Sequence, residues 1–317
     1  MLYYDRRLPP DLLALLTPGG PLAWLVEYVR SHDNSRIEFR ANRGGPGESC
    51  FQLYSGRGSL ARICWRAGGR VAVAADEAYQ GLAPGAFGAA RAPADLESVL
   101  RPYLAECAES MDPAFAKGEG AIQNDLMRRY GLFYGTGSLV LAVDSEVRVG
   151  FDRDETYVNG TEHSLAFKRE LQEQLGDPSQ GGHNKLDTLG ILPSGELAVI
   201  EIKDQDGDIR KAAQQLAANL YTLHTLREQD PDGFKTAVHG LVDQKIACSL
   251  IPSHPPVPRL SKPEMVAVIA APDLSSDWKR EWEKQVGDVL KNVPGVSYGV
   301  RFWLLSLEGE VVDEHRL

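Results

Sequence analysis

The amino-acid sequence predicts an α/β domain, with a central mixed sheet flanked by helices, in residues 112–317, and a small α+β module ahead of it in residues 1–111. The α/β prediction rests on apolar runs of strand length, such as residues 197–200 and 265–271, which are separated by segments of helical periodicity. The α+β prediction rests on short, partly alternating segments between glycine-rich turns. A chain of 317 residues with 43% hydrophobic content can fill one large core or two modest ones.

The first 111 residues predict two short helices, four strands and a closing helix. A Pro-Gly-Gly break separates the first two helices, and leucines at helical spacing mark the last one. The predicted helices are 11–16, 21–31 and 95–111, and the predicted strands are 36–40, 50–54, 60–65 and 70–74. This module shows no catalytic constellation, and we interpret it as a recognition or partner-binding module.

The remainder of the chain predicts helices that alternate with strands. Residues 121–130 form the first helix, because Ile122, Leu126 and Tyr130 stack one turn apart. Residues 138–151 form the first core strand, bent or as a hairpin. The later helices are 161–175, 208–225 and 276–291, the later strands are 186–192, 197–203, 265–271 and 298–306, residues 236–250 are a helix or a strand, and residues 251–258 are an extended connector.

Two charged residues, Glu201 and Lys203, follow the apolar run 197–200 and lie on one face of the predicted strand. A carboxylate and an ammonium beside a core are costly unless they pair or serve a metal. The preceding strand carries Asp187, and a Pro-Ser-Gly turn joins the strands, so a hairpin brings Asp187 and Glu201 to one end of the sheet. Two carboxylates there suit Mg²⁺ or Mn²⁺, with the main-chain carbonyl of Ile202 as a further ligand.

The pattern Asp187-x13-Glu201-x-Lys203 on consecutive strands resembles the signature of the PD-(D/E)XK nuclease superfamily, over about residues 112–225. Lys185 resembles the basic residue that often precedes the aspartate in that family. The resemblance implies a restriction-endonuclease-like fold, Mg²⁺ or Mn²⁺ as cofactor, and hydrolysis of nucleic-acid phosphodiester bonds, with DNA as the favoured substrate. Asp187 and Glu201 would hold the ion. Lys203 would orient or deprotonate water, or neutralise charge on the phosphate.

Two further residues extend the resemblance. Gln215, in the helix after the Glu-x-Lys strand, resembles the glutamine that several family branches place near the metal, and it matches better than Gln214. Glu119 lies one turn before Ile122, in the angular sector of the apolar stripe of the first helix, and it resembles the acid that the first core helix of the family often contributes. A favourable charge in the first helical turn is the other interpretation of Glu119. Glu146, on the first core strand, is the alternative candidate for this acid.

The alternative function is a catalytically silent protein of the same fold, which acts as a nucleic-acid-binding or protein-interaction subunit with residues 1–111 as its contact module. The net charge of −10 favours it, because an acidic chain binds nucleic acid weakly. Lys185, Lys203, Arg210 and Lys211 can still form a local basic groove, unless the last two are a solvated helix face. An ion-binding cluster at a sheet end argues against the silent protein, which has no physical need for one.

The composition also bears on location. No stretch approaches the ~20 apolar residues of a membrane span, and the N-terminus lacks the order of a signal peptide, so we expect a cytoplasmic protein. His183, in a glycine-rich loop, is interpreted as a surface residue. Widely scattered cysteines without metal-ligand spacing predict reduced, mostly buried thiols. The four cysteines are Cys50, Cys64, Cys107 and Cys248.

Overall fold

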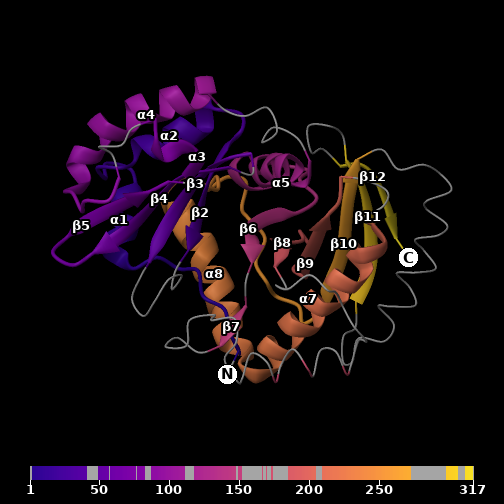
Figure 1. Ribbon diagram of the computed structural model, residues 1–317. Coiled ribbons are helices and arrows are strands. Elements are labelled where there is room, and N and C mark those ends of the chain that lie inside the picture. Colours follow the sequence, from indigo (N-terminus) through magenta and orange to yellow (C-terminus); the bar gives the residue numbers. More distant parts are fainter. Residues whose placement is uncertain are drawn as a thin grey trace.

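Three β-sheets and the helices around them make up the computed structural model (Figure 1). Among the described residues, one sheet has six strands, one has four, and one has two. The structure describes residues 2–40, 49–56, 58–75, 77–82, 87–110, 118–147, 149–151, 166, 169, 173, 185–204, 209–272, 298–305 and 311–316. The prediction of a mixed α/β protein is confirmed at this level.

The N-terminal module is an antiparallel meander with helices packed on it. Its helices are α1 (Pro10–Leu16), α2 (Trp24–Ser31), α3 (Glu77–Gln80) and α4 (Leu96–Ser110), and its strands are β2 (Ser35–Arg40), β3 (Cys50–Ser55), β4 (Gly58–Arg66) and β5 (Arg70–Ala74). The strands lie close to the predicted ranges, and they pair antiparallel in chain order. Helix α1 starts with Pro10, where the missing N–H costs nothing, and it ends at Leu16, just before Thr17 and Pro18.

Two of the four cysteines are bonded to each other, so the expectation of four reduced thiols is wrong. Cys50 on β3 lies directly opposite Cys64 on β4, with 4.1 Å between their Cα atoms, and the two form a disulfide. Cross-strand neighbours come this close only once the register is set, which the scattered spacing in the sequence does not reveal. Cys107 and Cys248 are free and buried, as expected.

The second part of the chain builds a six-stranded mixed sheet in the order β12-β11-β10-β9-β8-β6. The elements are α5 (Glu119–Met127), a π-helical turn (Arg128–Leu132), β6 (Leu141–Val147), β8 (Leu186–Ile191), β9 (Leu197–Ile202), α7 (Ile209–Gln229), α8 (Pro231–Ala247), β10 (Met265–Pro272), β11 (Tyr298–Leu305) and β12 (Val311–Arg316). Strands β6, β8 and β9 are antiparallel neighbours, and β10 runs parallel to β9.

One predicted element needs correction, one open alternative is resolved, and one strand was not predicted. Residues 138–151 are not one bent strand or a hairpin, because β6 is followed by β7 (Gly150–Phe151), which pairs with β1 (Leu2–Tyr3) in a separate sheet. Residues 236–250 lie mostly in α8, where Asp230 caps the helix by accepting a hydrogen bond from the Gly233 amide at 2.9 Å. The edge strand β12 is not predicted at all, since its sequence is polar and short.

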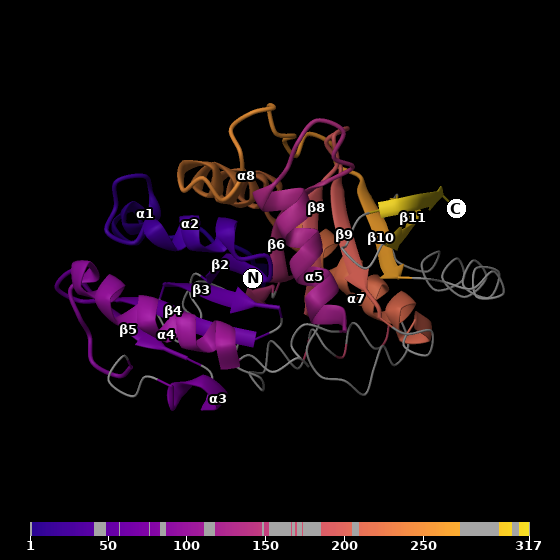
Figure 2. The ribbon, with the colours of Figure 1, turned by 90° about the horizontal axis from the view of Figure 1, so that it is seen from above.

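Helices α5 and α7 cover opposite faces of the six-stranded sheet (Figures 1 and 2). Strand β9 shows the reason, because its side chains alternate between two apolar clusters. Ile200 packs in one cluster with Ile122 of α5, whereas Val199 packs in the other with Leu216 of α7. The predicted alternation of side chains along β9 is therefore confirmed. Glu201, two residues after Val199, lies on the same face of the strand as Val199, which is the face that α7 covers.

A buried polar network joins the N-terminal module to β6 of the large sheet. Asp144, 1% exposed, accepts a hydrogen bond from the Tyr4 hydroxyl at 3.0 Å. Its carboxylate also lies 3.4 Å from Arg40 and 3.5 Å from Arg6, and both arginines are buried. An apolar cluster crosses the same junction, from α2 and β2 to β6. The predicted boundary after residue 111 stays a prediction, because residues 111–117 lie outside the described residues.

Glu38 on β2 forms a second part of this network and makes the stability of the protein pH-dependent. Burial raises the pKa of Glu38, but Lys245, at 2.9 Å, and the nearby arginines outweigh burial and hold it below 4.5. A carboxyl with a lowered folded-state pKa stabilises the fold above its unfolded pKa, and loses this contribution as pH falls through the folded value. We expect Glu38→Gln to be less stable than the wild type at pH 7, and the difference to narrow below pH 4.5.

Urea unfolding of both proteins at a series of pH values measures this difference. Because the other carboxylates are common to both proteins, their titration cancels in the comparison. A difference that is constant from pH 7 to pH 3 would contradict the assignment of a lowered pKa to Glu38.

None of the helices in the described part of the chain is long and apolar enough to cross a membrane. Several predictions concern residues that the structure does not describe, or describes only in isolated positions. They are the helix at 161–175, the helix at 276–291, His183 in its loop, and the side chains of Arg210, Lys211 and Gln214.

Candidate functional site

Strands β8 and β9 form the predicted hairpin and bring Asp187 and Glu201 to the same end of the sheet. Their ladder runs from Ile191↔Leu197 to Thr188↔Ile200. Gly195 in the connecting turn has φ 95°, and a Cβ there would lie 2.0 Å from the Ser261 hydroxyl, so only glycine fits. Local turn chemistry therefore fixes the register that aligns the two carboxylates.

The main-chain ladder ends just before the two acids. Beyond the pair Thr188↔Ile200, the amide of Ile202 donates a hydrogen bond to Oδ2 of Asp187 at 2.8 Å. The aspartate side chain thus takes the place of a main-chain acceptor at the end of the hairpin. Asp187 keeps part of its surface exposed, whereas Glu201 is 2% exposed.

Lys203 links two carboxylates from different elements. Its Nζ donates to Oε1 of Glu201 at 2.9 Å and lies 3.3 Å from Oε1 of Glu119. Glu119 is the first residue of α5, so its place in the first helical turn is confirmed, and the ion pair adds it to the cluster. Asp187, Glu201, Lys203 and Glu119, separated by up to 84 positions in the sequence, therefore lie together.

The pKa values of Asp187, Glu201 and Lys203 are all raised, but burial is the cause only for the two acids. Burial raises the pKa of Asp187 to about 6, although the ammonium of Lys203 opposes the rise. Burial, and next the charge of Asp187, raises the pKa of Glu201 well above 4.5. Burial alone would lower the pKa of Lys203, but the carboxylates, Glu201 first, raise it above 10.5. Lys203 is therefore an ammonium at neutral pH, which suits it to stabilise charge and not to act as a base.

The donor set fits a divalent cation that keeps part of its water shell. Oε2 of Glu201 is buried and has no hydrogen-bond partner among the described residues, which is costly unless a cation or water meets it. Mg²⁺ is typically held by one or two carboxylates and several waters. No three His, Cys, Asp or Glu side chains within the described ranges are arranged to hold a metal. The site thus offers the two carboxylates of Asp187 and Glu201 to an ion that keeps several of its waters, and it does not surround the ion with protein ligands.

The other predicted ligands are less well placed. Glu146, the alternative acid, forms an ion pair with Lys185, so these two predicted residues pair with each other. The amide oxygen of Gln215 is buried without a hydrogen-bond partner among the described residues, which leaves it available for water or a ligand. No described contact joins Gln215 to Asp187 or Glu201. Roles for Gln215 and for the carbonyl of Ile202 stay predictions.

Two residues near the site were not predicted. Gln123 on α5 donates a hydrogen bond from its side chain to the main-chain carbonyl of Asp187. Asp204 lies just after Lys203, and its Oδ2 would be 2.9 Å from a Cβ at Gly118, the residue before α5. Adjacency to Lys203 is the sequence signal for Asp204, whereas Gln123 lies among other polar residues of α5 and no local pattern distinguishes it.

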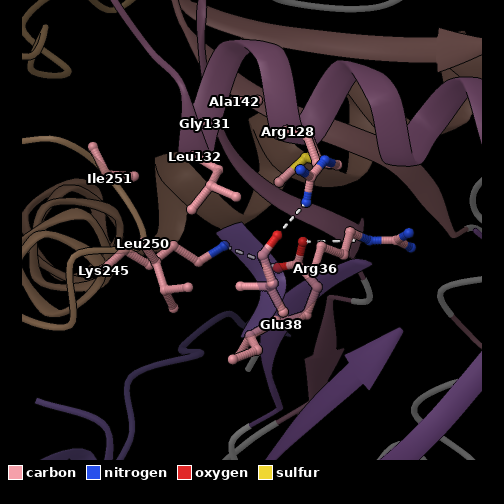
Figure 3. Close-up of a pocket in the computed structure, with 12 residues that line it drawn as sticks. Arg36, Glu38, Arg128, Gly131, Leu132, Ala142, Lys245, Leu250 and Ile251 are labelled. Carbon is pink, nitrogen blue, oxygen red and sulfur yellow. Dashed lines mark hydrogen bonds and ion pairs between the residues drawn. The ribbon is translucent and has the colours of Figure 1, made fainter. Parts of the chain in front are cut away.

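A separate cavity lies at the junction between the N-terminal module and the large sheet (Figure 3). Its volume is about 20 Å³, which is room for about one water. Arg36, Glu38, Arg128 and Lys245 supply its polar lining, and Figure 3 shows Lys245 reaching across it to Glu38. The cavity is too small for a substrate, and we assign it to the packing of the junction.

In comparisons with known proteins, no family model matches the chain, and neither a curated protein nor a solved structure matches it.

Proposed function

We propose that the protein is a nuclease that hydrolyses nucleic-acid phosphodiester bonds with Mg²⁺ or Mn²⁺. The observation that carries the proposal is the convergence of Asp187, Glu201 and Lys203 at the end of the β8–β9 hairpin. Two carboxylates and an ammonium in this arrangement can hold a hard cation beside a positive charge, which is what a phosphodiester requires.

The order of elements supports the proposal. Helix α5, with Glu119, precedes the strands, β8 carries Asp187, β9 carries Glu201, and α7 follows on the opposite face from α5. This is the order that the resemblance to PD-(D/E)XK nucleases implies, with a mixed central sheet between helices. We therefore propose a restriction-endonuclease-like fold for residues 112–317 as part of the same hypothesis.

Each residue has a role that its contacts allow. Asp187 and Glu201 would hold the ion, since Glu201 has an unpartnered buried oxygen and Asp187 is partly exposed. A divalent ion bound there supplies a Lewis acid that polarises the phosphate and acidifies water. Lys203, as an ammonium, orients water and stabilises negative charge that develops on the phosphate oxygens. Glu119 holds Lys203 in place through their ion pair.

The net charge of the chain does not favour a nucleic-acid substrate, so the attraction for it has to come from the charges at the site. The chain carries a formal net charge of −10, so sequence-independent attraction to a polyanion is weak. A bound divalent ion would offset the excess of the negative charges of Asp187, Glu201 and Glu119 over the positive charge of Lys203, so that the site itself would be close to neutral. We therefore expect activity to depend on the metal for substrate binding as well as for cleavage, and we favour DNA as the substrate.

The experiment is a cleavage panel of labelled single- and double-stranded DNA and RNA with Mg²⁺ or Mn²⁺, together with thermal unfolding of the wild type and Asp187→Asn in the presence of Mn²⁺. We expect metal-dependent cleavage that EDTA abolishes. We also expect Mn²⁺ to stabilise the wild type by about 2.7 kcal/mol when the free ion is at about 100 times its Kd. Asp187→Asn should lose most of this stabilisation, because it removes one anionic ligand.

The outcomes separate the proposal from its alternative. Cleavage together with a Mn²⁺ shift that Asp187→Asn loses supports the nuclease. A wild type that neither cleaves any substrate nor shifts with Mn²⁺ contradicts it, and favours a catalytically silent protein that acts through binding. Exposed Asp243→Asn, on α8, is the control for loss of a carboxylate elsewhere.

A further inference from the structure

We propose that Gln123 is a positioning residue for Asp187, and that the N-terminal module sets the geometry of the metal ligands through Arg36. This inference rests on the proposed function. Gln123 makes no contact with Glu201 or Lys203 among the contacts that the structure describes. It acts on the main chain of Asp187.

Hydrogen bonds connect Arg36, on β2 of the N-terminal module, to Asp187 through Gln123. The Arg36 guanidinium is 5% exposed, and its position is fixed by a hydrogen bond from NH1 to the carbonyl of Gly56 at 2.6 Å. The ring of Tyr54 lies under it, at 4.6 Å from the guanidinium carbon to the ring centroid. A planar cation held on several sides is a rigid reference point for the groups that it contacts.

Two neighbouring amides of α5 receive this guanidinium. NH1 of Arg36 donates to Oδ1 of Asn124 at 3.0 Å, and NH2 donates to Oε1 of Gln123 at 3.4 Å. Both amides are buried, at 1% exposed for Asn124 and 5% for Gln123. Of the two, Gln123 also has a described bond to the site, because its Nε2 donates to the carbonyl of Asp187.

The amide of Gln123 therefore carries a chain of bonds from the cation to the ligand. An amide whose oxygen accepts from a cation is a stronger donor through its nitrogen, so Arg36 strengthens the bond to Asp187. Fixing the carbonyl of Asp187 limits rotation of its backbone, while the Ile202 amide holds its carboxylate from the other side at 2.8 Å. The side chain is thus held in place before any ion arrives, which lowers the ordering cost of binding.

Gln123→Glu keeps the hydrogen bond from Arg36 and removes the one to the carbonyl of Asp187. The new carboxylate still accepts from Arg36, but it presents an oxygen instead of an N–H to the carbonyl of Asp187. Gln123→Met, of similar size, removes both bonds and serves as the second variant. Asn124→Ala is the matched control, because it removes an equally buried contact to Arg36 without a described bond to Asp187.

The measurement is calorimetric titration of Mn²⁺ alone into the full chain, with urea unfolding of each protein to record its stability. We expect Gln123→Glu and Gln123→Met to weaken Mn²⁺ binding by about 10- to 100-fold, the range typical of groups that orient metal ligands. We expect Asn124→Ala to bind Mn²⁺ within about twofold of the wild type, even though it is less stable.

Each outcome decides the inference. A wild type that binds Mn²⁺ and loses affinity only in the Gln123 variants supports it. A wild type that binds Mn²⁺ while the Gln123 variants bind equally well, or lose no more than Asn124→Ala, overturns it and leaves the proposed function standing. A wild type that binds no Mn²⁺ overturns this inference, and if it also cleaves no substrate it overturns the proposed function as well.

Discussion

Lys203→Ala is expected to reduce metal-dependent cleavage by a factor of about 10² to 10³ or more, while the chain still folds and binds Mn²⁺. The ammonium lies 2.9 Å from the Glu201 carboxylate, and its raised pKa keeps it charged at neutral pH. Removing it withdraws the one side-chain cation in contact with the proposed ligands among the described residues. Single-turnover cleavage under saturating Mn²⁺ measures the loss of the chemical step, and calorimetry measures Mn²⁺ binding.

Lys262→Ala is the matched control for this variant. Lys262 also pairs with a glutamate, Glu196, at 2.8 Å, but it is 45% exposed and lies in the connector after α8. It should leave cleavage unchanged within about twofold. Equal cleavage by Lys203→Ala and the wild type would exclude Lys203 from the mechanism, whatever the metal does. Restored cleavage in Lys203→Arg would show that the charge matters more than its geometry.

The hairpin of the candidate site could be predicted because its determinants are local. Apolar runs of strand length define β8 and β9, and the turn needs a glycine at Gly195, whose φ is 95°. Once the register is known, Asp187 and Glu201 must lie near the same end. The same reasoning identifies Glu119 only by its place in a helical turn, because the contact with Lys203 depends on how α5 docks on the sheet.

The junction between the N-terminal module and the large sheet could not be predicted. Strand β2 alternates Arg36, Glu38 and Arg40, a pattern that is typical of a solvated strand face, yet all three side chains are buried. Their charges are matched by residues far along the chain, such as Lys245, 207 positions from Glu38. No local pattern encodes such a pair. Gln123 was missed for the same reason, since its two partners come from other elements.

These long-range contacts change the expected relation between the two parts of the chain. The sequence suggests a separable recognition module, whereas β2 of that module contacts α5, β6 and α8 through buried charges. If one charged side chain of this junction is removed, its partner stays buried without a counter-charge, which is strongly unfavourable. The stability of the junction and the geometry of the candidate site are therefore linked through β2 and α5.

Asp144→Asn tests the strength of this junction, and we expect it to destabilise the fold by about 3–5 kcal/mol. The carboxylate is 1% exposed and faces Arg40 at 3.4 Å and Arg6 at 3.5 Å. Without its charge, two buried guanidinium groups lose their shared counter-ion, and burial leaves little water to replace it. The loss of stability is measured as the decrease in the free energy of unfolding in urea. If two transitions appear, the urea concentration at the midpoint of each transition is compared instead.

Two controls bracket this expectation. Asp243→Asn breaks an exposed pair with Arg259, whose N···O distance is 2.6 Å, and should cost no more than about 1 kcal/mol. Tyr4→Phe removes only the hydroxyl that donates to Asp144, and should cost about 1 kcal/mol. A cost for Asp144→Asn as small as that of Asp243→Asn would mean that water reaches the arginines, and would remove the basis for a rigid junction. A large cost with a single unfolding transition would show that both parts of the chain unfold as one unit, because the buried charges leave neither part stable alone.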